Sequence, residues 1–221
     1  MTGSYFQVDL LGPRAGEIVE QISGHAPPET GRVVTARIEE EDRQHAVRIL
    51  AMNPRYRLGY RFLAPREAAR LLEEKFIKAG AERLDPASYL TLRIEAGIPE
   101  AGYELVDEYT PLEVGLQFAV SETKGCYTGQ EVIARQITYD KVTQRLVGLR
   151  LRSDVDFSGE KVWAGGRPAG TVTSAVVSPR FGPIALAVIK RPHHEPGTQL
   201  VVGAEPAGQT AATVESLPFS N

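Results

Sequence analysis

The chain has 221 residues, of which 42% are hydrophobic and 24% charged, and its formal net charge is −3. This balance is typical of a folded globular protein and excludes a disordered chain, and the length suits one large domain or two small ones. Basic and acidic residues are mixed along most of the chain, so the sequence lacks the positive footprint of a protein that binds duplex nucleic acid. Neither a signal peptide nor an apolar run long enough to cross a membrane is evident, which predicts a cytoplasmic protein.

The first part of the chain predicts an α+β layer, with helices on one face of a mixed sheet. One helix is expected from Gly12-Pro13 to about Ile22, and a second from Pro65 to Gly80, because apolar residues recur at helical spacing between these start and stop signals. The apolar runs that indicate strands are 5–11, 33–38, 45–52 and 57–63.

Capping signals predict three further helices. Asp85 followed by Pro86 is a favourable helix start, and Gly97 with Pro99 is a stop. A Thr-x-x-Glu capping box satisfies the backbone N–H groups at a helix start and therefore marks one in the sequence. Two such boxes are present, Thr110–Glu113 and Thr128–Glu131.

Beyond Thr143 the sequence changes to short apolar runs separated by turns rich in glycine and proline. This pattern predicts a small C-terminal β-barrel. We therefore expect an α+β domain over 1–142 and a barrel domain over 143–221. The runs are 146–151, 161–163, 171–177, 184–189, 200–202 and 211–214.

Cys126 is the only cysteine, so this chain alone forms neither a disulfide nor an iron–sulfur cluster. Lys124 lies two residues before it and the expected helix start at Thr128 two residues after it, and both would stabilise a thiolate. Gly125 and Gly129 allow a positive φ and close backbone approach. The alternative is a cysteine packed beneath the helix start.

Glu95 is expected in the last turn of the helix that ends at Gly97, where a carboxylate opposes the helix dipole. Its two oxygens could accept hydrogen bonds from two adjacent N–H groups, such as those of an aminopyrimidine edge. The alternative is a salt bridge to a neighbouring arginine. Arg93 lies two residues away, so we expect its side chain on nearly the opposite side of the helix.

The sequence His193-His194-Glu195 could suggest metal ligands. Adjacent histidines diverge on a loop or strand, however, and no third ligand follows at helical spacing. We therefore predict a solvated loop and no metal site.

The segment Lys124-Gly125-Cys126-Tyr127-Thr128-Gly129-Gln130-Glu131 resembles the signature of YgfZ-type proteins, a branch of the aminomethyltransferase superfamily that includes the glycine-cleavage T-protein. Other stretches are similar to the superfamily as a whole, and together the resemblance covers nearly the whole chain. These stretches are 93–99, 102–105, 110–113, 172–175 and 183–187.

This resemblance implies a tetrahydrofolate cofactor, bound by the glutamate that matches Glu95. Arg93, Tyr127, Gln130 and Glu131 are the further residues that we expect at a cofactor site. The superfamily carries an additional part ahead of the point that matches the start of this chain, and that part completes the folate cavity.

The same resemblance implies a role for Cys126 as the functional thiol, with Lys124 beside it. YgfZ relatives assist the assembly or repair of iron–sulfur clusters, and through these clusters they affect tRNA modification. The expected partners are folate and iron–sulfur proteins or their assembly factors, and the expected role is accessory rather than catalytic.

Two alternatives remain at this point. One is an aminomethyltransferase or demethylase-like enzyme, whose acid or base would come from Glu122, Asp107 or a partner chain. Against it, the sequence has Gly59-Tyr60-Arg61 where the family often has Gly-Tyr-Glu, and 53–57 lack the corresponding T-protein pattern. The other is a chain that associates with itself or with a separate polypeptide to rebuild the cavity.

Overall fold

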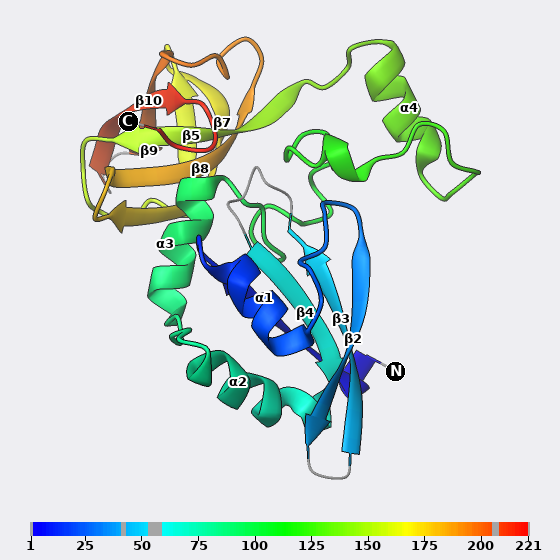
Figure 1. Cartoon of the computed structure of the whole chain (residues 1–221). Coiled ribbons are helices and arrows are strands. Elements are labelled where there is room, and N and C mark those ends of the chain that lie inside the picture. Colours follow the sequence, from blue (N-terminus) through cyan, green and yellow to red (C-terminus); the bar gives the residue numbers. More distant parts are fainter. Residues whose placement is uncertain (1, 41–42, 53–58, 205–207, 221) are drawn as a thin grey trace. The chain divides into compact units, whose positions relative to one another are not determined.

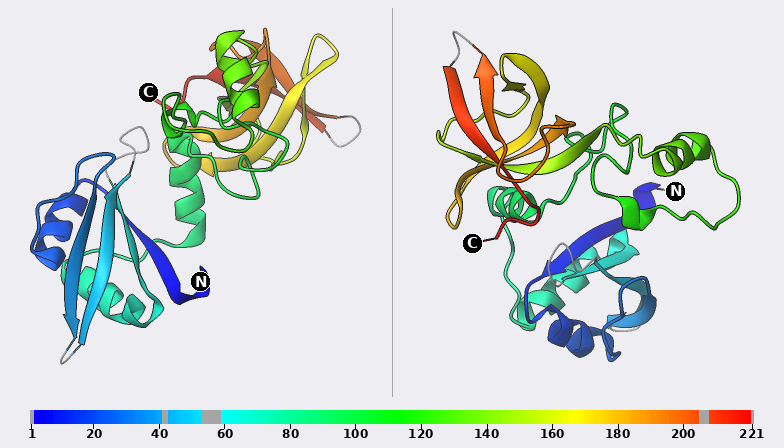
Figure 2. Two further views of the ribbon diagram at one scale, coloured as in Figure 1. Left: turned by 90° about the vertical axis from the view of Figure 1, so that its right-hand side faces the viewer. Right: turned by 90° about the horizontal axis from the view of Figure 1, so that it is seen from above.

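The computed structural model describes residues 2–40, 43–52, 59–204 and 208–220. The chain forms two compact units, Met1–Asp85 and Pro86–Asn221 (Figures 1 and 2). The first unit is a sheet with helices, and the second contains a closed β-barrel, which together confirm the predicted α+β class with a C-terminal barrel. Within the described ranges, no helix is both long and apolar enough to cross a membrane.

The sheet of the first unit has four strands in the order β1-β4-β3-β2. Every pairing between these strands is antiparallel, so the mixed sheet expected from the sequence is corrected in this detail. The predicted strands are present, although 53–58 lie outside the described residues, including the first two positions predicted for the fourth strand. The strands are β1 (Tyr5–Leu11), β2 (Val33–Glu40), β3 (Arg43–Ala51) and β4 (Gly59–Pro65).

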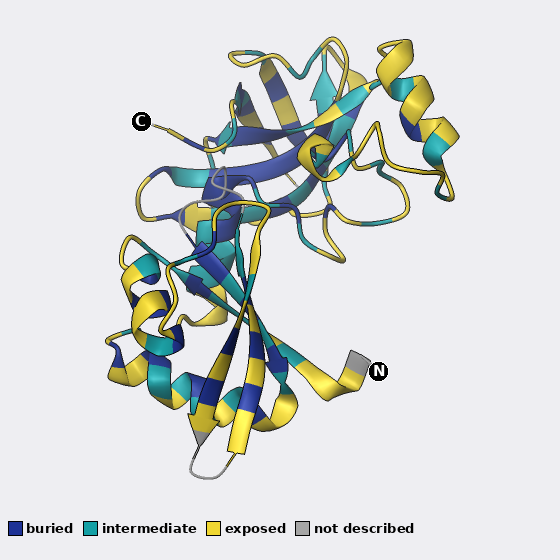
Figure 3. Ribbon diagram, turned by 45° about the vertical axis from the view of Figure 1, so that its right-hand side comes forward, coloured by how far each residue is buried: buried dark blue, intermediate teal, exposed yellow. Residues whose placement is uncertain are grey.

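Both predicted helices of this unit are present as α1 (Ala15–Ser23) and α2 (Ala69–Lys78), the latter preceded by a short 3₁₀ turn, η3 (Arg66–Ala68). Side chains alternate between buried and exposed along β3, because successive residues of a strand point to opposite faces (Figure 3). The helices cover the buried face. Phe62 of β4 meets Phe76 of α2 edge to face, with ring centroids 4.9 Å apart.

The second unit begins with α3 (Pro86–Ala96), as its capping signals predict. Ile94 of α3 is fully buried in a cluster with Ile184 and Leu186 of the barrel, so the helix packs on the outside of β7 and β8. All six predicted barrel strands are present, and they close in the order β10-β5-β8-β7-β6-β9. They are β5 (Gln144–Leu151), β6 (Lys161–Ala164), β7 (Arg167–Ser178), β8 (Gly182–Lys190), β9 (Gln199–Ala204) and β10 (Gly208–Glu215).

The helix predicted from the Thr110–Glu113 capping box is wrong. Glu113 does accept a hydrogen bond from the backbone N–H of Thr110 at 2.9 Å, as in a capping box. Its backbone carbonyl, however, accepts from Leu146 of β5 at 2.7 Å, and Gly115 has a φ of 80°. The chain therefore forms turns and a short 3₁₀ helix, η4 (Gln117–Ala119), because the barrel strand takes a carbonyl that a helix would need.

Candidate functional site

The last turn of α3 is buried on all sides, and its centre is Arg93. The Arg93 side chain has no exposed surface. Its Nη1 donates to Glu104 Oε2 at 2.8 Å and to the Ile98 carbonyl at 3.0 Å, and its Nη2 donates to Ser174 Oγ at 2.6 Å. The guanidinium also lies 5.0 Å from the ring centroid of Tyr103. Its contacts are with protein groups, and the prediction that Arg93 binds a cofactor stays a prediction.

Arg93 has two counter-ions: Glu104, which is equally inaccessible to solvent, and the partly exposed Glu100, whose Oε2 lies 3.0 Å from Arg93 Nε. Besides Arg93, the Glu104 carboxylate accepts from the hydroxyls of Thr173 at 2.6 Å and Ser174 at 2.7 Å, and from the N–H of Glu100 at 3.1 Å. Consecutive strand residues normally point to opposite faces, but the pairing of β7 with β8 shifts register between Val172 and Ser174. This irregularity lets two neighbouring hydroxyls reach one carboxylate. The Glu104 carboxylate therefore accepts hydrogen bonds from four donor groups.

Glu95 lies two residues beyond Arg93 and is 5% exposed. Its Oε1 accepts a hydrogen bond of 2.7 Å from Ser178 Oγ, and its backbone carbonyl accepts from the N–H of Phe219 at 2.9 Å. Arg93 and Glu95 thus attach to different hydroxyls of the same strand. The two side chains diverge as predicted from their spacing, yet both are buried, because α3 is covered at its C-terminal end.

The phenol of Tyr109 is affected both by burial and by the carboxylates of this region. Burial, followed by the negative charges of Glu108, Glu104 and Glu113, raises the pKa of Tyr109 above its ordinary value of 10.0. The hydroxyl therefore stays protonated at neutral pH and remains a hydrogen-bond donor.

Cys126 is a free and exposed cysteine, so the alternative of a packed, buried thiol is wrong. The helix after it is present as α4 (Gln130–Thr138), but it begins later than predicted. Its N-cap is Gly129, which has a φ of 87°, whereas a capping box would have used Thr128. The helix start therefore lies one residue farther from Cys126 than the capping box predicted.

The other residues of the segment 124–131 make mainly local contacts. The ammonium of Lys124 lies 4.6 Å from the ring centroid of Tyr127, a cation–π contact. Gln130 Oε1 accepts from the Tyr127 N–H at 3.2 Å, which helps to close the start of α4. Glu131 is exposed in the first turn of α4, a helix that is exposed along most of its length (Figure 3). The carboxylates of Asp107 and Glu122 are exposed as well.

The pattern at 193–195 is not a uniformly solvated loop, which corrects the prediction. The His194 side chain is only 8% exposed and its Nδ1 lies 3.3 Å from Glu195 Oε1. Burial lowers the pKa of His194 from its ordinary value of 6.5, and the attraction of Glu195 opposes that effect. Among the described residues, no group of three histidine, cysteine or acidic side chains is placed to hold a metal ion.

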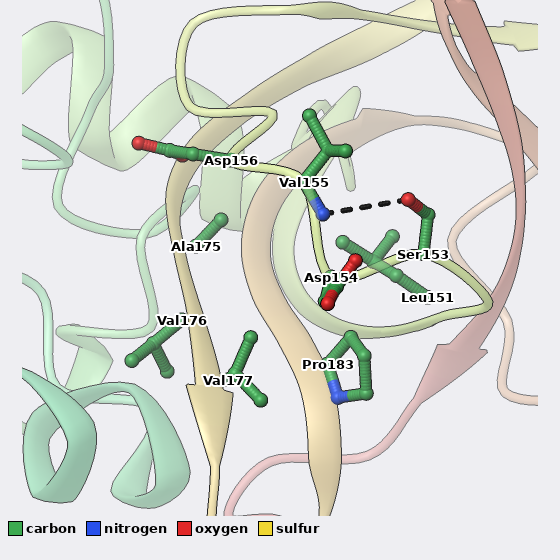
Figure 4. A pocket seen from close by; sticks show the side chains of 9 residues that line it. All are labelled: Leu151, Ser153, Asp154, Val155, Asp156, Ala175, Val176, Val177 and Pro183. Atoms are coloured by element: carbon green, nitrogen blue, oxygen red, sulfur yellow. Dashed lines mark hydrogen bonds between the residues drawn. The ribbon is translucent and has the colours of Figure 1, made fainter.

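An open pocket of about 210 Å³ lies on the barrel, between the β5–β6 loop and the ends of β7 and β8 (Figure 4). The hydroxyl of Ser153 accepts from the N–H of Val155 at 3.4 Å at its rim. No residue predicted as part of a functional site lines this pocket. Its lining residues are Leu151, Ser153, Asp154, Val155, Asp156, Ala175, Val176, Val177 and Pro183.

Sequence reasoning did not single out Glu104, Ser174 or Ser178. Glu104 and Ser174 lie in segments that resemble the superfamily, 102–105 and 172–175. Neither segment contains a pattern that predicts which side chain the residue would bond to. Ser174 bonds to Arg93 and Glu104, and Ser178 bonds to Glu95, because α3 packs on β7.

Two protein-family models match the chain. The model described as the GCVT N-terminal domain matches residues 1–124, and the glycine cleavage T-protein C-terminal barrel domain matches 144–220. A chloroplastic protein of Arabidopsis thaliana named as a transferase, At1g60990, is 33% identical over 151 residues, which are 68% of this chain and 35% of that protein. An aminomethyltransferase of Rubrobacter xylanophilus is 37% identical over 161 residues, 72% of this chain and 42% of that enzyme.

The fold has a solved counterpart. The crystal structure of glycine cleavage system aminomethyltransferase T from Bartonella henselae aligns with a TM-score of 0.75 and 23% identity, over 98% of this chain and 60% of that chain. At this identity the likeness concerns the fold. The chain spans less than two thirds of the length of each of these three proteins.

Proposed function

The chain belongs to the glycine cleavage T-protein family, and from this membership we propose that it takes part in tetrahydrofolate-dependent one-carbon transfer of the aminomethyltransferase class. Two consecutive family models support the proposal, because they match the α+β part and the barrel in chain order. The named relatives, an aminomethyltransferase and a transferase, belong to the same class of chemistry. These relatives are longer than this chain, so their whole activity is carried over here as a proposal.

The observation that carries the proposal is the placement of Glu95. Its carboxylate is nearly removed from water and one oxygen is held by Ser178. A pterin presents adjacent N–H donors on its aminopyrimidine edge, and a carboxylate matches them with two acceptor oxygens. A hydrogen bond to a desolvated carboxylate is stronger than one in water, so Glu95 suits the recognition of such an edge.

In this proposal the chain contributes binding and orientation. Tetrahydrofolate, when bound, supplies the amine nitrogens that accept the one-carbon unit. Glu95 would orient the pterin by accepting its N–H groups, and the ion pair of Arg93 with Glu104 would keep the last turn of α3 rigid beneath it. A protein group held in this way contributes to catalysis by positioning.

Titration calorimetry with tetrahydrofolate tests the ligand. We expect binding by the wild type and a loss of at least tenfold in affinity for Glu95→Gln, because the substitution removes a charged acceptor. Glu131→Gln is the matched control, since Glu131 is an exposed carboxylate of α4. If the two substitutions change the affinity equally, Glu95 does not recognise the pterin.

A product assay separates transfer from binding alone. With an aminomethyl donor and tetrahydrofolate, a transferase forms methylenetetrahydrofolate, whereas a binding protein does not. The acid or base would come from Asp107, Glu122 or a partner chain, so Asp107→Asn and Glu122→Gln are assayed beside the wild type. Binding without product in any condition would leave a folate-binding protein and contradict the transferase proposal.

A second candidate function rests on the exposure of Cys126. We propose for it an accessory role in the assembly or repair of iron–sulfur clusters, and through them in tRNA modification, as the resemblance of the segment 124–131 to YgfZ-type proteins implies. An exposed thiol is accessible to a partner protein. Complementation of a strain deficient in cluster assembly tests this role: Cys126→Ser should abolish rescue and Ser121→Ala should retain it. Full rescue by Cys126→Ser would show that the thiol is not required for this role.

A further inference from the structure

The pocket on the barrel has an apolar floor and an apolar rim (Figure 4). Leu151 is one of the buried residues of the barrel core and Ala175 packs against that core, so the floor of the pocket is one end of the core itself. Val155 and Val177 also line the pocket, and they are 58% and 52% exposed. Apolar side chains that remain exposed beside a hollow are typical of a surface that binds another molecule.

The charge of this pocket is negative. Its lining includes the carboxylates of Asp154 and Asp156, and none of the described residues that line it is basic. Asp156 Oδ1 accepts from the backbone N–H of Ser158 at 2.9 Å and so helps to shape the loop. The Asp154 side chain takes part in no hydrogen bond or ion pair within the described part of the chain. Figure 4 shows its carboxylate directed toward Leu151 and Pro183, whereas the Asp156 side chain points away from them.

The size of the pocket limits what it can hold. Its volume is about 210 Å³, whereas pockets that enclose a drug-sized ligand usually measure roughly 300–1,000 Å³. A whole cofactor would therefore not be enclosed here. A single arginine or lysine side chain suits the pocket, because its aliphatic stem packs on apolar surface while its charged end stays near water and pairs with a carboxylate.

We propose that this pocket is a docking site for a basic side chain of a protein partner, whose charged end pairs with Asp154. The residues beside that side chain in the partner would cover Val155 and Val177, which a free small cation would leave exposed. The inference is independent of the proposed function, because no residue assigned to folate lines the pocket.

A titration followed by the amide resonances of the isotope-labelled protein tests the docking site. The probe is the peptide acetyl-Leu-Arg-Leu-amide, which presents one guanidinium between two apolar residues. We expect saturable shifts confined to 151–156, 175–177 and 183. The same peptide with citrulline in place of arginine keeps the shape and loses the charge, and it should bind about fivefold more weakly, as the loss of one solvent-accessible ion pair would predict.

Two variants and one control locate the contacts. Asp154→Asn should weaken binding of the arginine peptide about fivefold and leave binding of the citrulline peptide unchanged, because the carboxylate acts on the charge. Val177→Ser removes part of the apolar rim and should weaken binding of both peptides about threefold. Glu160→Gln changes another carboxylate of the barrel unit, one that does not line the pocket, and should change neither affinity.

Four outcomes would overturn the proposal. The first is the absence of saturable shifts at the pocket in the wild type, and the second is equal binding of the arginine and citrulline peptides. The third is binding of butylguanidinium as tight as that of the peptide, which would make the pocket a site for a small cation. The fourth is a shift of the same resonances with protein concentration alone, which would make a second copy of this chain the occupant.

Discussion

Arg93 and Glu104 form an ion pair of 2.8 Å, and neither side chain is exposed to solvent. The pair is completed by Ser174 of β7, which accepts from the arginine and donates to the glutamate. A buried charge left without its partner is strongly destabilising, and here two carboxylates face the buried guanidinium, because Glu100 Oε2 also lies 3.0 Å from Arg93 Nε. This network links the C-terminal end of α3 to β7, beside the apolar cluster in which Ile94 packs on the barrel.

Glu104→Gln removes one charge of this pair and keeps the volume of the side chain. We expect a loss of about 2 kcal/mol in the free energy of unfolding, because Arg93 loses its fully buried counter-ion and keeps only the partly exposed Glu100. Urea unfolding measures the change. Glu74→Gln serves as the control: it breaks the exposed pair with Arg70, and such a pair contributes less than about 1 kcal/mol. Similar losses for the two variants would contradict a structural role for the buried pair.

Stability should depend on pH through His194. Burial lowers the pKa of this imidazole below 6.5, while Arg145 and Arg191 lower it further and Glu195 opposes them. The unfolded chain therefore binds the proton more readily than the folded one. The stabilising contribution is fully present above the unfolded pKa of about 6.5 and is lost as the pH falls from there through the lower, folded pKa.

Thermal unfolding between pH 7.5 and 5.5 measures this dependence. His194→Gln should reduce the fall in the melting temperature over that interval, since the neutral side chain takes up no proton. His193→Gln replaces the preceding histidine and is the matched control. An unchanged slope in His194→Gln would show that the imidazole is not the group that titrates.

The Cys126 thiol should react with a thiol reagent in the native protein. Because the cysteine is exposed, we expect reaction of one thiol per chain without denaturant. Cys126→Ser should change the free energy of unfolding by no more than about 0.5 kcal/mol, as surface substitutions usually do. A thiol that reacts only after urea is added would contradict the exposed position.

Gly129 and Gly125 allow a comparison that distinguishes the effect of backbone conformation from that of steric room for a side chain. A methyl group at either position would meet nothing within 4 Å, but only Gly129 has a positive φ, of 87°. The positive φ that the sequence allowed at both glycines is thus used at one of them. Gly129→Ala should destabilise the start of α4 by about 1 kcal/mol, because a Cβ is unfavourable in the left-handed region.

Amide hydrogen exchange in the first turn of α4 measures this effect. Gly125→Ala should leave the exchange rates unchanged, and Gly129→Asn should cost less than Gly129→Ala, since asparagine tolerates the left-handed conformation better. Equal exchange in Gly129→Ala and Gly125→Ala would mean that the positive φ is not required for the helix to begin.

Local patterns were sufficient to predict most elements of this fold. The strand over 5–11, the helix that Pro86 begins and Gly97 ends, and the six barrel runs all follow from periodicity and from residues with restricted backbone angles, which act within a few positions of the chain. Local patterns did not decide whether Cys126 is exposed or buried, because the residues around a cysteine in sequence do not show which other segments cover it.

Long-range pairing decided the rest. Glu113 carries the residues of a capping box, yet its carbonyl bonds to β5 and no helix forms. Glu95 and Ser178 are 83 positions apart, and Arg93 and Ser174 are 81 apart. Their contacts exist because the barrel closes and α3 packs on its outside, where burial of apolar surface brings the polar groups out of water and each must find a partner. The sequence by itself identifies the polar side chains, such as Glu95 and Ser178. Only the packing of α3 on the barrel decides which atoms bond to one another.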